Sequence, residues 1–172
     1  MDDDQWEMFT LGIGMMVRSG ALLEYTLHGL AAHLLEAHSA YGEGWAADPV
    51  TQHIEVCEKA ARDSESPLPE PAREALLADL ASCRRVLDRR NLFVHACWQY
   101  EEESGLWWGI KANRKEKGRA QVESARSREP LELSAEIGHL QQDVLGWDIE
   151  FFGEDGDPDE GEPSRVVVKR LI

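Results

Sequence analysis

The chain has 172 residues, of which 42% are apolar, so it is long and apolar enough to form one globular core rather than a disordered segment. It carries 33 acidic and 18 basic side chains, and its net charge of −15 excludes indiscriminate coating of nucleic acids. No stretch reaches the roughly 18 apolar residues of a membrane span, so we expect no membrane partner. Three cysteines without a CxxC pair favour reduced thiols in a cytoplasmic protein.

The first half of the chain shows helical periodicity. Apolar residues at steps of three and four predict a long helix from about Asp4 to Ala37 and a shorter helix after Pro49. A second long helix is predicted to begin near Pro71, because proline suits a first helical turn, and to end near His95. The apolar positions are Phe9, Ile13, Met16, Leu23, Leu27, Leu30 and Leu34, then Ile54, Cys57 and Ala61, then Leu76, Leu80, Cys83, Leu87 and Val94.

The period changes after this third helix. Residues 98–112 are aromatic and β-branched around a Ser-Gly turn, which predicts a short hairpin, and the RKEKGR segment after it is expected to be a loop. Residues 130–147 return to helical spacing with Ser134 as the expected N-cap, and the terminal RVVVKRLI is typical of a strand. The predicted fold is mainly α, a helical bundle with a small hairpin and strand appendage. Residues 1–147 form the helical domain, and residues 148–172 form an acidic linker and the terminal strand.

The sequence RRNLFVHACW, residues 89–98, places several polar groups at the end of the third helix. Arg90 lies about 140° around an ideal helix from His95, so the two would converge only if two copies met about a two-fold axis. Asn91 is one turn from His95 and can hydrogen-bond and orient its ring. A polar stripe about 60° wide is formed by Arg84, Asp88, Asn91 and His95.

A cleft that combines arginine and histidine side chains supports RNA transesterification without a metal or another cofactor. The pKa of histidine, roughly 6.5, lets it take the proton of the 2′-hydroxyl or give one to the 5′-oxygen leaving group. Arginine can bind the scissile phosphate through two hydrogen bonds and stabilise the charge that develops in the transition state. The histidines at positions 28, 33 and 38 form no metal-binding pair, so no metal site is expected.

The RNLFVH segment, residues 90–95, resembles the R-x4-6-H motif of the HEPN superfamily, in the form in which a polar residue follows the arginine. The LLEYTLHGL run, residues 22–30, is similar to the first helix of HEPN domains. The resemblance covers roughly residues 6–100. It implies an α-helical bundle of about four helices that dimerises through the motif helices. It also implies that Arg90 and His95 are catalytic and that Asn91 supports them. Arg89 stands at a permitted spacing too, and the choice between the two arginines stays open.

A basic strip follows the predicted hairpin. Residues 111–128 hold seven of the 18 basic residues and two acidic ones, which makes the strip a candidate path for RNA, or an exposed loop without that role. Trp107 and Trp108 are available to stack on bases, although packing within the hairpin is the simpler interpretation. The candidate RNA-binding residues are Arg84, Arg89, Arg114, Lys115, Lys117 and Arg119.

The resemblance implies a homodimeric, metal-independent endoribonuclease that serves as a toxin or defence effector, with an antitoxin or other regulatory protein as a further partner. The alternative is a non-catalytic HEPN-like dimer that recruits a partner protein or a nucleotide. The net charge of −15 favours that alternative, because a ribonuclease gains from a positive field. A third hypothesis is that acidic residues 154–163 mimic nucleic acid, although a solvated linker is the simpler interpretation.

Overall fold

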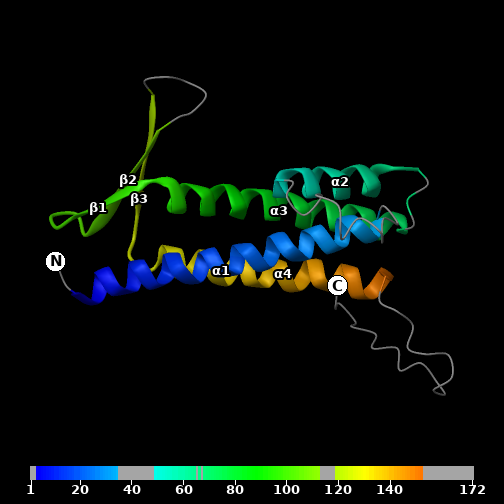
Figure 1. Ribbon diagram of the computed structural model, residues 1–172, viewed down its shortest axis with the longest axis horizontal. Coiled ribbons are helices and arrows are strands. Elements are labelled where there is room, and N and C mark those ends of the chain that lie inside the picture. The colour runs from blue at the N-terminus through cyan, green and yellow to red at the C-terminus, as the bar shows by residue number, and fades with distance from the viewer. Residues whose placement is uncertain (1–2, 35–48, 65, 67, 113–118, 153–172) are drawn as a thin grey trace, which may run out of the picture.

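A computed structural model describes residues 3–34, 49–64, 66, 68–112 and 119–152 of the chain. Most of these residues are helical, so the prediction of a mainly α fold with a small β appendage is confirmed. Within the described residues, no helix combines the length and the apolar character needed to cross a membrane. The elements in chain order (Figure 1) are α1 (Asp3–Leu34), α2 (Val50–Arg62), α3 (Glu70–His95), β1 (Cys97–Glu101), β2 (Leu106–Ala112), β3 (Ala120–Ala125) and α4 (Glu129–Phe152).

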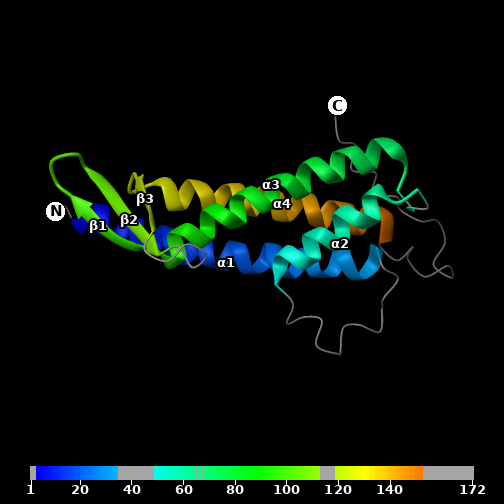
Figure 2. The same ribbon diagram turned by 90° about the horizontal axis from the view of Figure 1, so that it is seen from above.

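The first and the last helix of the described chain, α1 and α4, lie side by side and run in the same direction (Figures 1 and 2). Polar contacts join them at steps of seven residues, a spacing that keeps the same faces together when two helices cross at a small angle. The contacts are Ser19 Oγ to Ser134 Oγ at 3.1 Å, Gln141 Nε2 to Thr26 Oγ1 at 3.2 Å, and His33 Nδ1 to Asp148 Oδ1 at 2.6 Å.

Helix α3 runs in the opposite direction across this pair, and α2 covers only part of it. In both views α2 lies beside the first half of α3 and the C-terminal half of α1, whereas the last turns of α3 extend beyond α2 (Figures 1 and 2). Two contacts place α2: the rings of His53 and His28 lie 5.0 Å apart, and Arg84 Nη2 lies 3.5 Å from Glu58 Oε1. The end of α3 that carries the RNLFVH segment is therefore more open than its beginning.

The predicted apolar stripes form the core. In α1 the buried residues include Phe9, Met16, Leu23, Leu27 and Leu30, each 2% exposed or less. The expected stripe of α3 is also buried, with one exception at its end: Val94 is 36% exposed. Val94 is exposed because α2 does not extend to this turn.

The hairpin is present as β1 and β2, and it is extended by a third strand in an antiparallel sheet of order β1-β2-β3. Gly105, with φ of 68°, supplies the left-handed residue of the turn. The sheet packs on the helices through aromatic rings: Trp107 stacks on Phe9 with centroids 4.2 Å apart, and Trp98 stacks on Phe93 at 4.9 Å. The sheet therefore braces the end of α3.

One local prediction was wrong, and one strand was not predicted. The RKEKGR segment, residues 114–119, was expected to be a loop, and residues 114–118 of it lie outside the described residues. The residues after it, Ala120–Ala125, pair with β2, Val122 opposite Ile110, as strand β3. Ser134 is not an N-cap, because α4 begins five residues earlier at Glu129 and Ser134 is buried against α1. The predicted terminal strand at residues 165–172 lies outside the described residues.

Candidate active site at the end of α3

The RNLFVH segment completes α3 without a break. The helix ends at His95, and the N–H of Ala96 donates to the carbonyl of Leu92 at 2.9 Å before the chain turns into β1. Because the segment is regular helix, its side chains leave at helical angles, and His95 lies about 140° around the axis from Arg90. The two side chains therefore point in different directions within one chain, as the sequence predicted.

Arg90 is held between two helices. Its Nη1 atom lies 3.3 Å from Glu24 Oε1 on α1 and donates to Asn91 Oδ1 at 3.0 Å. The side chain of Arg90 is only 17% exposed and that of Glu24 is 35% exposed. In such a partly buried setting the carboxylate compensates the cost of desolvating the guanidinium. The charge of Arg90 is thus kept in a fixed position beside Asn91.

A glycine makes room for this arrangement. A Cβ atom at Gly20 would stand 3.1 Å from Arg90 Nε, so a side chain at position 20 would require the guanidinium group to shift by a few tenths of an ångström. Arg90 Nε is itself buried and has no hydrogen-bond partner among the described residues. A buried N–H without a hydrogen-bond partner lowers the stability of the fold. Close packing against Gly20, rather than a hydrogen bond of Nε, therefore determines the position of this part of the Arg90 side chain.

Asn91 and His95 do not form the expected hydrogen bond. The amide oxygen of Asn91 accepts from Arg90 instead, and His95 is exposed on the last turn of α3. The arrangement leaves the imidazole accessible to a ligand or to a second protein chain. The last two turns of α3 thus carry a fixed cation, Arg90, and an exposed imidazole, His95.

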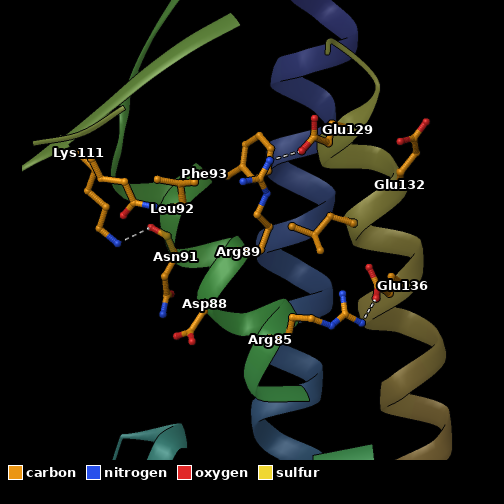
Figure 3. Close-up of a pocket in the computed structure, with 12 residues that line it drawn as sticks. Arg85, Asp88, Arg89, Asn91, Leu92, Phe93, Lys111, Glu129, Glu132 and Glu136 are labelled. Atoms are coloured by element: carbon orange, nitrogen blue, oxygen red, sulfur yellow. Dashed lines mark hydrogen bonds and ion pairs between the residues drawn. The ribbon is translucent and has the colours of Figure 1, made fainter. Parts of the chain in front are cut away.

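A pocket of about 660 Å³ lies between α3, the sheet and the start of α4, and Asn91 of the motif is one of the residues that line it (Figure 3). Arg85 and Arg89 reach across to α4, where Arg85 Nη2 lies 2.6 Å from Glu136 Oε1 and Arg89 pairs with Glu129. Arg89 also lies 3.6 Å from Glu123 Oε2 and over the ring of Phe93. Arg89 therefore belongs to the pocket, and Arg90 is the arginine beside Asn91.

The pocket is a poor candidate for a phosphate groove. Three basic and four acidic side chains line it, and both arginines are already paired with carboxylates. Its residues are Arg85, Asp88, Arg89, Asn91, Leu92, Phe93, Lys111, Gln121, Glu129, Glu132, Leu133 and Glu136.

Two of the other candidate RNA-binding residues lie in the described part of the chain. Arg84 is paired with Glu58 of α2, and Arg119 is exposed at the start of β3. Residues 114, 115 and 117, also expected to bind RNA, lie outside the described residues. Of the two tryptophans, Trp107 is buried in the core at 1% exposure, and Trp108 is 39% exposed with its Nε1 bonded to Glu101.

Two neighbours of the motif were not identified from the sequence. Glu24 lies in the LLEYTLHGL run, which resembles the first helix of HEPN domains. The carboxylate in that run was the only feature of the sequence that could have indicated a partner for Arg90. Lys111 was seen only as part of the basic strip, but its Nζ donates to the backbone carbonyl of Asn91 at 3.3 Å (Figure 3). Both contacts depend on how separate elements pack, which helical spacing within α3 does not reveal.

Comparison with known proteins identifies no relative. No protein-family model matches the chain, and no curated protein or solved structure matches it either.

Proposed function

We propose that the chain is a metal-independent endoribonuclease of HEPN type, acting in the cytoplasm as a toxin or defence effector. The observation that carries the proposal is the guanidinium of Arg90, held by Glu24 and Asn91 within two turns of the exposed His95. Because these two side chains diverge within one chain, the proposed site is composite, with Arg90 from one copy and His95 from the other.

The proposed reaction is transesterification of the RNA backbone. A histidine removes the proton of the 2′-hydroxyl, and the 2′-oxygen attacks the adjacent phosphorus. The bond from phosphorus to the 5′-oxygen breaks, and the imidazolium formed in the first step gives its proton to that oxygen. The products are a 2′,3′-cyclic phosphate and a 5′-hydroxyl end. Arg90 stabilises the charge on the phosphoryl oxygens in the transition state, and its fixed position lowers the reorganisation that this requires.

The direct test is cleavage of total RNA by purified protein in excess EDTA, followed by mapping of the ends. Wild-type protein is expected to produce 2′,3′-cyclic phosphate ends, and His95→Ala to produce none while keeping its helicity. His139→Ala is the matched control, since His139 is an exposed histidine of α4. Equal cleavage by wild type and His95→Ala would remove His95 from the mechanism.

A non-catalytic dimer that recruits a partner protein or a nucleotide is the second candidate. Its support is the way carboxylates neutralise basic residues near the motif, as in the pairs Arg84–Glu58 and Arg89–Glu129. Such pairing weakens the positive field that draws RNA to a site. Intact RNA with both proteins, together with capture of one specific protein that His95→Ala no longer binds, would favour this candidate. An antitoxin that covers the motif would be such a protein.

A further inference from the structure

The outward side of α1 is an apolar surface in an otherwise highly charged molecule. Leu11, Met15, Leu22 and Tyr25 are 61%, 47%, 48% and 72% exposed, and on an ideal helix they fall within about 80° of one another. Val17, 37% exposed, and Ala21, also exposed, widen this surface on the side of α3. We call these six residues the α1 face. Of the eleven large apolar side chains that are exposed in the described residues, five belong to it.

The charge pattern distinguishes the α1 face from the rest of the chain. Charged residues make up 30% of the sequence, yet between Leu11 and Tyr25 the only ones are Arg18 and Glu24. Glu24 is turned toward Arg90, so Arg18 is the single charge among the exposed side chains of this stretch. Contiguous apolar surface of this kind is uncommon on a monomer and marks a site of interaction.

We infer that the α1 face is the surface through which two copies of the chain pack about a two-fold axis. Two copies that each carry a net charge of −15 repel one another, so contact is favoured where carboxylates are absent. A two-fold axis makes the same patch meet itself, which an apolar surface tolerates without any complementary charge. The inference rests on the proposed function, because it names the surface on which the composite site depends.

The α1 face is continuous with the candidate site. Val17 and Ala21 flank Gly20, the residue against which Arg90 Nε packs, and the same edge leads to Glu24. On α3, Val94 lies one helical turn after Arg90 and is 36% exposed. A second copy that covers the α1 face and this open edge would bring its own His95 toward the Arg90 of the first chain. The site is incomplete without that copy.

The charges around α1 argue against a membrane or a nucleic acid as the occupant. A helix that lies on a membrane surface has lysine or arginine along its polar face, whereas α1 begins with Asp3, Asp4 and Glu7. An RNA strand would meet one cation, Arg18, on the whole face. An apolar helix face with one charge is matched by a similar apolar protein surface.

Light scattering coupled to size exclusion, on the full chain over a range of concentrations, tests the inference. Wild type and His95→Ala are expected at twice the chain mass, and Leu22→Glu at the mass of one chain. The dimer dissociation constant of Leu22→Glu should rise on the order of 100-fold or more, because each copy would bury a carboxylate, and a pair with Arg18 one turn away would itself have to be desolvated. Ile149→Glu is the matched control: Ile149 is 63% exposed on α4, outside the α1 face, and the variant should stay dimeric.

Dimeric Leu22→Glu with wild-type helicity, or wild type that stays monomeric at high micromolar concentration, would overturn the inference. Hydrogen exchange of the wild type gives a check that does not depend on folding of the variant. Protection of residues 11–25 should increase with protein concentration, and concentration-independent exchange there would contradict the inference. The RNA assay separates this outcome from failure of the proposed function. Cleavage by a monomer would overturn the interface and the composite site but not the ribonuclease activity, and a dimer that leaves RNA intact would overturn the activity alone.

Discussion

At the scale of single residues, the surroundings of Arg90 decide what its charge can do. An arginine on the surface is solvated and moves among many rotamers, whereas Arg90 is fixed by Glu24 on α1 and by its neighbour Asn91. Gly20 leaves the space that the guanidinium occupies. A preorganised cation of this kind contributes more to transition-state stabilisation than a mobile one, since less ordering is needed during the reaction.

Replacement of Glu24 by glutamine should therefore reduce activity more than stability. The amide keeps the shape of the side chain but removes the charge that orients Arg90, so we expect RNA cleavage to fall roughly tenfold, which corresponds to about 1.4 kcal/mol in the barrier. The Michaelis constant should change less than the turnover number, because Glu24 acts through Arg90 rather than on RNA. Initial rates over a range of RNA concentrations measure both quantities.

Glu136→Gln is the control for Glu24→Gln. Glu136 pairs with Arg85 on the other flank of α3, where both side chains are largely exposed, and removal of its charge should leave cleavage unchanged. Equal loss of activity in the two variants would show that the general charge of the protein, not the position of Arg90, is responsible.

The residues of the candidate site were predictable only where they share one helix. Arg90, Asn91 and His95 could be placed relative to one another because α3 is regular from Glu70 to His95. The contacts of Arg90 with Glu24 and of Lys111 with Asn91 join different elements, and their geometry depends on interhelical packing. The hydrogen bond that Asn91 could form with His95 is absent, and the Oδ1 of Asn91 accepts from a charged donor, Arg90, instead.

At the scale of elements, the apolar periodicity predicted the helices well. The structure of segments rich in polar residues was predicted less well. The six residues of β3, AQVESA, contain one β-branched residue, so they lack the pattern of an independent strand and owe their conformation to pairing with β2. Ser134 matched an N-cap by composition, but the contact with Ser19 of α1 holds it inside α4. The unpredicted strand and the wrong N-cap both concern residues whose structure is set by a partner element.

The contact between β2 and β1 gives a test of how the sheet supports the motif. A Cβ atom at Gly109 would stand 2.7 Å from the ring of Trp98, whose Nε1 donates to the carbonyl of Phe93 near the end of α3. Gly109→Ala should therefore lower the free energy of unfolding by about 1–3 kcal/mol, because the ring is packed on Phe93 and cannot move freely. Urea denaturation followed by circular dichroism measures this change.

A glycine without neighbours provides the comparison. No atom beyond the local backbone of α4 would lie within 4 Å of a Cβ at Gly138, so Gly138→Ala should raise stability by up to about 1 kcal/mol through helix propensity. Gly109→Ala with wild-type stability would mean that Trp98 does not brace the end of α3.

At the scale of the whole molecule, the bundle buries two thiols and exposes one. Burial raises the pKa of Cys57, on α2, to about 12, with a further contribution from Cys83, and burial likewise raises the pKa of Cys83, on α3, to about 12. Cys97 is exposed at the start of β1. The ionisation of Cys57 and Cys83 therefore reports whether α2 stays packed against α3.

These pKa values predict an alkaline loss of stability. Above the ordinary thiol pKa of 9.0 the unfolded chain releases two protons that the native chain retains up to about pH 12. The free energy of unfolding should thus fall as the pH rises from 9 toward 12, and Cys83→Ala should reduce the slope. Urea midpoints between pH 8 and 11 measure the effect. A slope in Cys83→Ala equal to that of the wild type would contradict this assignment.

The proposed composite site requires one residue from each chain of the dimer. Mixing two inactive variants tests this requirement most directly. Arg90→Ala and His95→Ala are each expected to leave RNA intact. Chains of the two variants, exchanged by joint refolding and verified as mixed dimers by native mass spectrometry, contain one complete site when Arg90 and His95 come from different copies. An equal mixture should then recover about a quarter of the wild-type rate, since half of the dimers are mixed and each has one of its two sites intact. A mixture that stays inactive, under conditions in which the wild type cleaves, would show that Arg90 and His95 do not act across the dimer.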